Sequence, residues 1–348
     1  MTPLVVVDAD VLGRHRTGDE TYVRNLLREL APVAAESGLR IAAVTRRPDL
    51  VPSGIEPVEL RARSQEVRMA FSLPRLLRRL RADLVHTQYA LPLRLPCPGV
   101  VTVHDLSFAR EPELMKWKDT LVFRAVVPRA VRRAARVLTV SERTKADLIE
   151  LYGVPAERIV VTPNGVDPAF RPASSGHEIP SIDQLQGSYV LAVGAIQARK
   201  NQLAALEAAR TVGLELVVAG PEKDPALADE LRRGGARVEG YVETERLAEL
   251  YRGAACLVQA SRFEGFGLPV LEAMASGTPV VAVPEPALLE VAGDAAVFVD
   301  GEQLADGIRR ALAERDRLAA AGLERARAFG WRATAERTLE VYREILGA

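Results

Sequence analysis

At residues 261–277 the chain reads Ser-Arg-Phe-Glu-Gly-Phe-Gly-Leu-Pro-Val-Leu-Glu-Ala-Met-Ala-Ser-Gly. An apolar run of β-forming residues precedes this stretch. Pro269 suits the first residue of a helix, and Gly277 suits its end. Gly265 and Gly267 let the main chain approach a ligand closely just before the helix, where backbone amides have no intrahelical partner. The stretch therefore predicts a strand, a ligand-binding loop and a helix.

The same alternation of apolar strands and helical patterns runs through the rest of the chain. We expect strands at Leu4–Val7, Arg40–Val44, Leu84–His86, Val100–Val103, Val137–Val140 and Ile159–Thr162, and then at Tyr189–Val193, Leu214–Ala219, Arg237–Val238, Cys256–Gln259, Pro279–Val283 and Ala296–Val299. Nearly continuous apolar strands separated by helices indicate parallel sheets that are buried on both faces. Each half is therefore expected to form a doubly wound, Rossmann-like α/β domain, with ligands in a cleft between the halves.

Helix signals and a linker divide the chain further. Asp19–Ser37 has a helical apolar stripe, and Ser141 is the expected N-cap of a helix that ends at Gly153. The Pro/Ser/Gly-rich segment 171–187 is the expected linker. The last helix, Trp331–Leu346, carries an apolar stripe and is expected to pack on another part of the protein.

Composition excludes several classes of protein. The 348 residues carry 46 basic and 46 acidic side chains, and 48% are hydrophobic, which argues against disorder and against attraction of nucleic acid by net charge. Residues 1–172 hold 27 basic and 20 acidic residues (+7), and the remainder holds 19 and 26 (−7). The two distant cysteines give no disulfide framework and favour the cytoplasm. The apolar start is broken by Asp8 and Asp10, unlike a signal peptide, and we expect no transmembrane segment.

Two adjacent cations stand before a second helix. A strand ends at Gly194, Arg199 and Lys200 follow, and a helix is expected after Asn201, a common N-cap type. Cations are unfavourable at a helix N-terminus unless an external anion compensates them, and a diphosphate fits that position. The alternative is that both are solvated loop charges.

The opening stretch also holds two carboxylates. Glu264 lies in the loop before the helix, and Glu272 lies near the first helical turn. Carboxylates in that arrangement can hold sugar or ribose hydroxyls. The alternatives are a loop carboxylate for Glu264 and a partner of the helix dipole for Glu272.

Glu264 and Glu272, separated by seven residues within Glu-Gly-Phe-Gly-Leu-Pro-Val-Leu-Glu-Ala-Met-Ala, resemble the signature of the family 4 retaining glycosyltransferases of the GT-B fold (glycosyl transferases group 1). Segments that match the family in order are Thr17–Tyr22, Val103–Asp105, Val140–Ser141, Thr162–Asp167, Arg199–Asn201, Val218–Gly220, Gly240–Val242 and the helix after Phe329-Gly-Trp331.

This resemblance implies two Rossmann-like domains that face each other across a cleft: an N-terminal acceptor-binding domain at 1–172 and a C-terminal donor-binding domain at 173–330. Part of 331–348 would return to the first domain. The implied enzyme is a hexosyltransferase that moves mannose or glucose from a UDP- or GDP-linked sugar to a hydroxyl on a sugar, a lipid-linked molecule or a small molecule. It would retain the anomeric configuration and need neither a cofactor nor a metal.

The resemblance also assigns roles to residues. Arg199 and Lys200 would bind the donor diphosphate and neutralise charge as the glycosidic bond breaks. Glu264 would hold the donor sugar and Glu272 the ribose. The remaining donor contacts would come from Gly265, Phe266, Gly267, Leu268 and Val270, with the base near Gly240, Tyr241 and Val242. From the first domain, Gly18 would approach the phosphates, His104 would face the sugar as a catalytic group, and Tyr22 and Asp105 would lie on the acceptor side.

Two departures from the family pattern stand out. The family commonly has Gly-x-Gly before the tyrosine, whereas here Gly18 is followed by Asp19 and Glu20. We expect the Glu20 side chain to narrow the acceptor pocket or to repel anions. Ala195 also stands where many members have arginine, and Arg199 is expected to compensate.

Other interpretations remain open at this stage. Asp8-Ala-Asp10 spells the Asp-x-Asp of metal-dependent glycosyltransferases, although the four histidines show no metal-ligand spacing. The chain could be a non-catalytic nucleotide-sugar-binding or assembly subunit with the same fold. An NAD-dependent epimerase is disfavoured, because no Gly-x-Gly-x-x-Gly follows the first strand.

Two arginine-rich segments suggest a further partner. Basic residues interleave with apolar ones at 61–81 and at 116–136. Such helices can dock on anionic lipid, which would place the protein at the inner face of the membrane; the alternative is two ordinary solvated helix faces.

Overall fold

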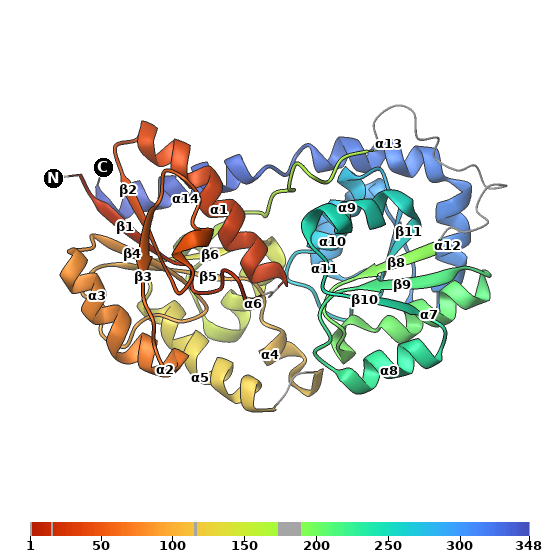
Figure 1. Ribbon diagram of the computed structural model, residues 1–348, viewed down its shortest axis with the longest axis horizontal. Coiled ribbons are helices and arrows are strands. Elements are labelled where there is room, and N and C mark those ends of the chain that lie inside the picture. The colour runs from red at the N-terminus through yellow and green to blue at the C-terminus, as the bar shows by residue number, and fades with distance from the viewer. Residues whose placement is uncertain (1, 15–16, 115–116, 173–188, 348) are drawn as a thin grey trace. The chain divides into compact units, whose positions relative to one another are not determined.

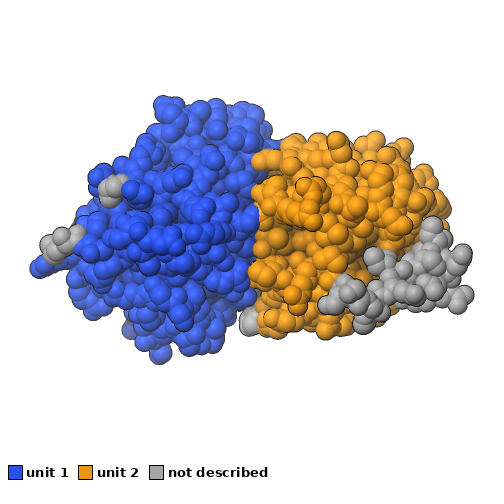
Figure 2. Space-filling model, turned by 90° about the horizontal axis from the view of Figure 1, so that it is seen from above, with its two compact units in different colours: residues 1–165, 330–348 blue, residues 166–329 orange. Residues whose placement is uncertain are grey.

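The structure is a computed structural model that describes residues 2–14, 17–114, 117–172 and 189–347 (Figure 1). The chain divides into two compact units, coloured separately in Figure 2. Unit 1 comprises Met1–Gly165 and Gly330–Ala348, and unit 2 comprises Val166–Phe329. Residues 173–187 of the expected linker lie outside the described residues.

Unit 1 is built on one parallel sheet. Its strands are β1 (Leu4–Asp8), β2 (Arg40–Thr45), β3 (Glu56–Glu59), β4 (Leu84–Gln88), β5 (Gly99–Val103), β6 (Arg136–Thr139) and β7 (Ile159–Val161), in the order β3-β2-β1-β4-β5-β6-β7. Its helices are α1 (Thr17–Glu36), α2 (Gln65–Val67), α3 (Leu73–Leu80), α4 (Ser107–Arg110), α5 (Trp117–Arg133), α6 (Glu142–Tyr152) and α14 (Trp331–Leu346). In Figure 1, α1 and α14 lie on one face of the sheet, and α3 and α5 lie on the other.

Unit 2 repeats the same topology with six strands. They are β8 (Tyr189–Val193), β9 (Glu215–Ala219), β10 (Arg237–Gly240), β11 (Ala254–Gln259), β12 (Val280–Ala282) and β13 (Val297–Phe298), in the order β10-β9-β8-β11-β12-β13. Its helices are α7 (Gln202–Thr211), α8 (Pro225–Arg233), α9 (Thr244–Gly253), α10 (Leu268–Ala275), α11 (Pro286–Ala292), α12 (Leu304–Ala313) and α13 (Arg315–Ala326). All of the strand pairs are parallel, as the apolar runs predict.

The predicted strands agree with the structure except at one edge. β3, Glu-Pro-Val-Glu, was not expected from the sequence, and three of its four residues are exposed. A short, charged strand that contains proline is typical of a sheet edge, where the apolar signal of buried strands is missing. The helix after Ser141 has the expected caps, because the Ser141 side chain accepts a hydrogen bond from the Thr144 amide and Gly153 is left-handed.

The chain passes between the units at two neighbouring points. The Val166 amide donates to the Phe329 carbonyl at 3.3 Å. This bond ties the segment after Gly165 to unit 2, so the division falls earlier than the expected boundary at residue 172.

Helix α14 completes unit 1 although it is remote in sequence. The Tyr342 hydroxyl lies 2.5 Å from His86 Nδ1, and His86 Nε2 lies 2.7 Å from Thr102 Oγ1. Burial lowers the pKa of His86 to about 3, so this histidine is a neutral hydrogen-bonding group within the core.

Ion pairs occupy the carboxyl end of β1. Arg68, which is 1% exposed, donates to both carboxylate oxygens of Asp8 at 2.6 and 2.7 Å. Arg46 donates to Asp10 at 2.9 and 3.0 Å, and Arg14 pairs with the same carboxylate. Arginine side chains of the same unit therefore pair with both carboxylates of the Asp-x-Asp sequence.

Removing one partner of the Asp8–Arg68 pair should destabilise unit 1. Arg68→Met leaves a buried carboxylate without its cation, at a cost of about 3–5 kcal/mol in the free energy of unfolding. Chemical denaturation at pH 7 would measure the loss, and Arg79→Met, which removes an exposed arginine, is the control. Adding Asp8→Asn to Arg68→Met should restore part of the stability; a double variant no more stable than Arg68→Met would contradict this account.

Candidate donor site and family

In unit 2 the topology itself creates a place for a ligand. β8 and β11 are neighbours, and the chain winds away from them in opposite directions, to β9 and β10 on one side and to β12 and β13 on the other. In doubly wound sheets, ligands bind beyond the carboxyl ends of the strands at such a reversal. Gly194 follows β8 at this edge, and Gln259 ends β11.

The two predicted cations reach Glu264 at this edge. Lys200 Nζ donates to Glu264 Oε1 at 2.6 Å, and Arg199 Nη1 lies 3.9 Å from Glu264 Oε2. The Arg199 guanidinium also donates to the Phe263 carbonyl at 2.8 Å. The adjacent residues Arg199 and Lys200 thus form one cluster with Glu264, which follows Lys200 by 64 residues in the sequence. The three side chains are only 7 to 15% exposed.

The cluster keeps Glu264 ionised. Burial alone would raise the pKa of this carboxyl, but the charges of Lys200 and Arg199 and hydrogen bonds from Lys200 and Ser261 outweigh burial and lower it. A buried carboxylate that remains charged can stabilise a developing positive charge on a ligand.

The backbone before α7 differs from the expected cap. Asn201 occupies the N-cap position of α7, as expected, but it is left-handed (φ 51°) and makes no side-chain capping bond. Asparagine tolerates this conformation better than most residues, and here it turns the chain directly after Lys200. Gly194 (φ 133°) faces the lysine stem, because a Cβ at this position would lie 3.2 Å from Lys200 Cε.

The glycine loop leads into α10 as the sequence predicts, with one difference. Gly267 has φ 105°, and a Cβ there would lie 2.6 Å from Leu288 Cδ2, so only glycine fits. Pro269 lies in the first turn of α10, which begins at Leu268. The Val270 amide, expected to be open to a ligand, donates to the Gly267 carbonyl at 3.0 Å. Phe266 is buried, with its ring 5.9 Å from that of Phe329, and Gly265 precedes it in the loop.

Glu272 lies in a separate, less charged setting on α10. The Tyr251 hydroxyl donates to its Oε2 at 2.9 Å. Burial raises the pKa of Glu272 to about 8, Asp167 adds to this rise, and the Tyr251 hydrogen bond opposes it. The two signature glutamates therefore differ in charge at neutral pH: Glu264 is ionised and Glu272 is mostly protonated.

The segment predicted to hold the base lies at the end of β10. Gly240 is left-handed (φ 69°), and its carbonyl accepts a hydrogen bond from the Gly220 amide at 2.7 Å. Tyr241 is 37% exposed, and Val242 follows it in the loop before α9.

In unit 1, His104 has the features of a ligand-facing group. Its Nε2 is buried and has no hydrogen-bond partner among the described residues. The ring packs edge-on against Tyr22 at 4.7 Å and lies 5.5 Å from Tyr89. Burial lowers the pKa of His104, against the opposing charges of Asp19 and Asp105, and this favours a neutral imidazole.

The other unit 1 predictions fare differently. Tyr22 is completely buried and bonded to Thr102 Oγ1 at 3.1 Å, and its ring packs against His104; its place on the acceptor side stays a prediction. Asp105 accepts hydrogen bonds from the Ser107 amide and hydroxyl at 3.0 and 2.8 Å. Gly18 is exposed in the first turn of α1, with open space beside its Cα.

Glu20 does not act as expected. It is 4% exposed, and its Oε1 accepts hydrogen bonds from the Gly13 amide at 2.8 Å and from Arg24 at 2.9 Å. The side chain turns inward and fixes the preceding loop. It therefore does not project from the surface as a charged group.

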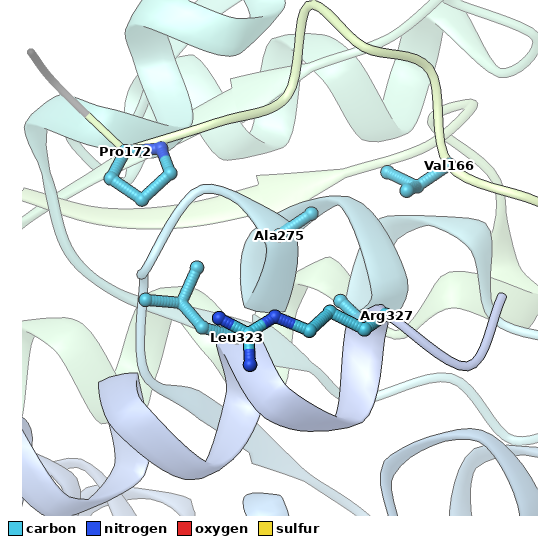
Figure 3. Close-up of a pocket in the computed structure, with 6 residues that line it drawn as sticks. Val166, Pro172, Ala275, Leu323 and Arg327 are labelled. Carbon is cyan, nitrogen blue, oxygen red and sulfur yellow. The ribbon is translucent and has the colours of Figure 1, made fainter. Parts of the chain in front are cut away.

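A further pocket of unit 2 has a different set of lining residues. Its volume is about 330 Å³, and it is lined by Val166, Pro172, Ala275, Leu323, Ala326 and Arg327 (Figure 3). It contains none of the predicted site residues. Within the described residues, no group of three or more His, Cys, Asp or Glu side chains is arranged to hold a metal ion, and no helix there combines the length and apolarity needed to cross a bilayer.

Comparison with known proteins places this geometry in a family. Residues 16–170 match the model described as Glycosyltransferase Family 4, and residues 182–329 match Glycosyl transferases group 1. The chain is 31% identical over 276 residues to O-antigen chain mannosyltransferase B of Escherichia coli, a match that covers 73% of this chain and 72% of the relative. The chain belongs to glycosyltransferase family 4.

Two further comparisons extend this result. The glycosyltransferase is 34% identical over 305 residues to D-inositol 3-phosphate glycosyltransferase of Thermobispora bispora, covering 76% and 71% of the two chains. Its fold matches that of HepE from Anabaena in complex with UDP and glucose, with a TM-score of 0.75, 16% identity and coverage of 99% and 100%. The GT-B fold predicted from the sequence is confirmed, with a Rossmann-like sheet in each unit.

Sequence reasoning missed three polar partners in the glycosyltransferase: Gln259 and Ser261 beside Glu264, and Tyr251 beside Glu272. One signal was present for the first, because Gln259 is a polar residue that ends an apolar strand at the ligand edge. Tyr251 gave no signal, since its helix α9 only becomes a neighbour of α10 through the fold.

The raised pKa of Glu272 predicts a pH-dependent stability. A carboxyl whose pKa rises from 4.5 to about 8 on folding contributes fully below pH 4.5, and that contribution is lost as the pH rises to about 8. The melting temperature of Glu272→Gln should therefore rise relative to wild type between pH 5 and pH 8.5. Glu207→Gln, which removes an exposed carboxylate from the same unit, is the control. A difference that is the same at both pH values would contradict the assignment.

Proposed function

We propose that the protein is a retaining, metal-independent hexosyltransferase that takes mannose or glucose from a UDP- or GDP-linked sugar. The observation that carries this proposal is the cluster of Arg199, Lys200 and Glu264 at the strand reversal of unit 2. Two cations beside one ionised carboxylate suit a ligand with a diphosphate at one end and a positively polarised carbon next to it.

The leaving group explains the need for the cations. When the bond between the anomeric carbon and the phosphate oxygen breaks, the electron pair stays on the diphosphate, and Lys200 and Arg199 stabilise that charge. The acceptor hydroxyl oxygen bonds to the anomeric carbon, and its proton passes to the departing phosphate oxygen. Glu264 stabilises the positive charge of the sugar, since its Oε1 is already held by Lys200 and Gln259 and is poorly suited to attack.

Two other groups of unit 2 are proposed to complete the donor site, and one group of unit 1 is proposed to contact the sugar. Glu272 is proposed to bind ribose hydroxyls, and the main chain around Gly240–Val242 to contact the base. His104, with a buried and unpartnered Nε2, is proposed to hydrogen-bond a hydroxyl of the transferred sugar.

The relatives support the choice of substrate class. One relative is named as a mannosyltransferase, and the structural neighbour HepE is described in complex with UDP and glucose. These names favour a hexose on a nucleoside diphosphate. The acceptor remains a hydroxyl of unassigned identity.

Lys200→Met should weaken donor binding and turnover together, because a charge-assisted contact to phosphate is lost. The expected loss is about 10- to 100-fold in affinity for UDP or GDP. Thermal shift with each nucleotide and nucleoside diphosphate release from UDP-glucose and GDP-mannose, both measured in EDTA, would test it. Lys223→Met, which changes an exposed lysine of the same unit, is the matched control. Unchanged binding in Lys200→Met would refute the site, and loss of wild-type turnover in EDTA would refute metal independence.

We also propose that unit 1 touches an anionic membrane on the cytoplasmic side. In α5, Trp117 and Leu121 are 71% and 64% exposed, and Val122 is also exposed. The exposed cations of the same helix are Lys118, Arg124, Arg129, Arg132 and Arg133, against one exposed acid, Asp119. An aromatic and aliphatic surface bordered by cations suits the interface of anionic lipid.

A second apolar group extends this surface. Phe71 and Leu93 are each 57% exposed, and Arg75 lies 5.9 Å from the Phe71 ring. The two groups are linked, because the Leu93 amide donates to the Met69 carbonyl and the Arg133 guanidinium donates to the Leu93 carbonyl.

Both cysteines are free thiols, which fits a reducing compartment.

Replacing Trp117 and Leu121 together with glutamine should reduce membrane binding at least tenfold, because each loses about 1.5–3 kcal/mol of apolar burial. Co-sedimentation with vesicles of phosphatidylglycerol and phosphatidylcholine at low and high salt is the measurement. Leu289→Gln, at an exposed leucine of unit 2, is the control. Wild-type protein that stays in the supernatant at low salt would end this proposal and leave the donor site untouched.

A further inference from the structure

Gln259 is a polar side chain in an apolar setting. It ends β11, an interior strand of the unit 2 sheet on which every residue is buried, and Gln259 itself is 2% exposed. An amide buried to this degree is costly unless its hydrogen bonds are made.

The amide makes two such bonds, both as a donor. Its Nε2 lies 2.9 Å from Ser261 Oγ and 2.5 Å from Glu264 Oε1. Glu264 Oε1 also accepts from Lys200 at 2.6 Å, so one carboxylate oxygen is held from two directions by two different elements.

The two donors differ in one respect that matters for the reaction. Lys200 is a cation on a flexible stem, and a bound diphosphate would compete with Glu264 for it. Gln259 is neutral, buried and fixed by Ser261, so a diphosphate would not draw it away. A bound donor would therefore weaken the hydrogen bond from Lys200 to Glu264 and leave the hydrogen bond from Gln259 to Glu264 in place.

We propose that Gln259 is a positioning residue that holds Glu264 in place while Lys200 moves onto the donor diphosphate. This inference rests on the proposed function, because it assumes that Lys200 binds the donor. Gln259 itself is not expected to touch the substrate. Because its Nε2 donates to the Glu264 carboxylate, its hydrogen bond also favours the charged form of Glu264.

Gln259→Met keeps the length of the side chain and removes the amide. In nucleotide-sugar hydrolysis by the full chain, kcat should fall about tenfold with little change in KM, because only the carboxylate that acts on the reacting sugar is loosened. The acidic limb of the kcat profile should move up by about one pH unit. Gln259→Asn, which retains an amide on a shorter stem, should lie between wild type and Gln259→Met.

Gln202→Met is the matched control. Gln202 is a buried glutamine of the same unit, 3% exposed, whose amide donates to the Ala195 carbonyl at 3.1 Å. Its loss should lower the melting temperature without moving the pH profile.

A double-mutant cycle separates positioning from folding. If Gln259 acts through Glu264, Gln259→Met should have little further effect on kcat in a Glu264→Gln background. Additive losses in kcat, or a pH profile of Gln259→Met that matches that of Gln202→Met, would overturn the inference while wild-type turnover upheld the proposed function. Absence of donor binding and hydrolysis in the wild-type chain would instead refute the proposed function.

Discussion

The arrangement of the candidate site in unit 2 depends on the buried ion pair between Lys200 and Glu264. Each charge would be costly to bury alone, and together they are stable only because further donors complete the carboxylate. The strand order brings the two residues together, since β8 and β11 end side by side. Two glycines leave space around these charged residues. Gly194 leaves room for the aliphatic part of the Lys200 side chain, and Gly267 lets the chain turn into α10 beside Leu288.

In unit 1, buried acidic side chains are paired with arginines of the same unit. Asp8 and Asp10 at the carboxyl end of β1, and Glu20 in the first turn of α1, all have arginine partners within the same unit. These acids are thus neutralised by arginines of the protein. In the cluster of unit 2, by contrast, Arg199 and Lys200 bring two positive charges to the one negative charge of Glu264. Burial favours the neutral imidazole of His104, and its buried Nε2 has no hydrogen-bond partner in the part of the chain that the structure describes. This difference in charge supports the proposal that unit 2 binds the anionic part of a nucleotide-sugar donor.

The sequence alone predicts much of this fold because buried parallel strands leave a strong apolar pattern. It fails at β3, whose exposed edge position removes that pattern. The residue types at the donor site could also be predicted, since Arg199, Lys200, Glu264 and Glu272 lie beside glycines and helix starts. Their partners could not, because Gln259 and Tyr251 meet the glutamates only through packing between different elements. The inward turn of Glu20 was missed for the same reason: its direction depends on the Gly13 amide and Arg24.

The return of α14 to unit 1 has a consequence for how this chain can be divided and made. The sheet of unit 1 is complete by residue 161, yet His86 Nδ1 on β4 pairs with the hydroxyl of Tyr342 on α14. A ribosome therefore finishes the first sheet long before it supplies α14, and the part of that face which α14 covers beside α1 stays exposed while unit 2 is synthesised. Cutting the gene at the first crossing would leave this exposure permanent, whereas joining residue 330 directly to residue 165 would preserve the covered unit.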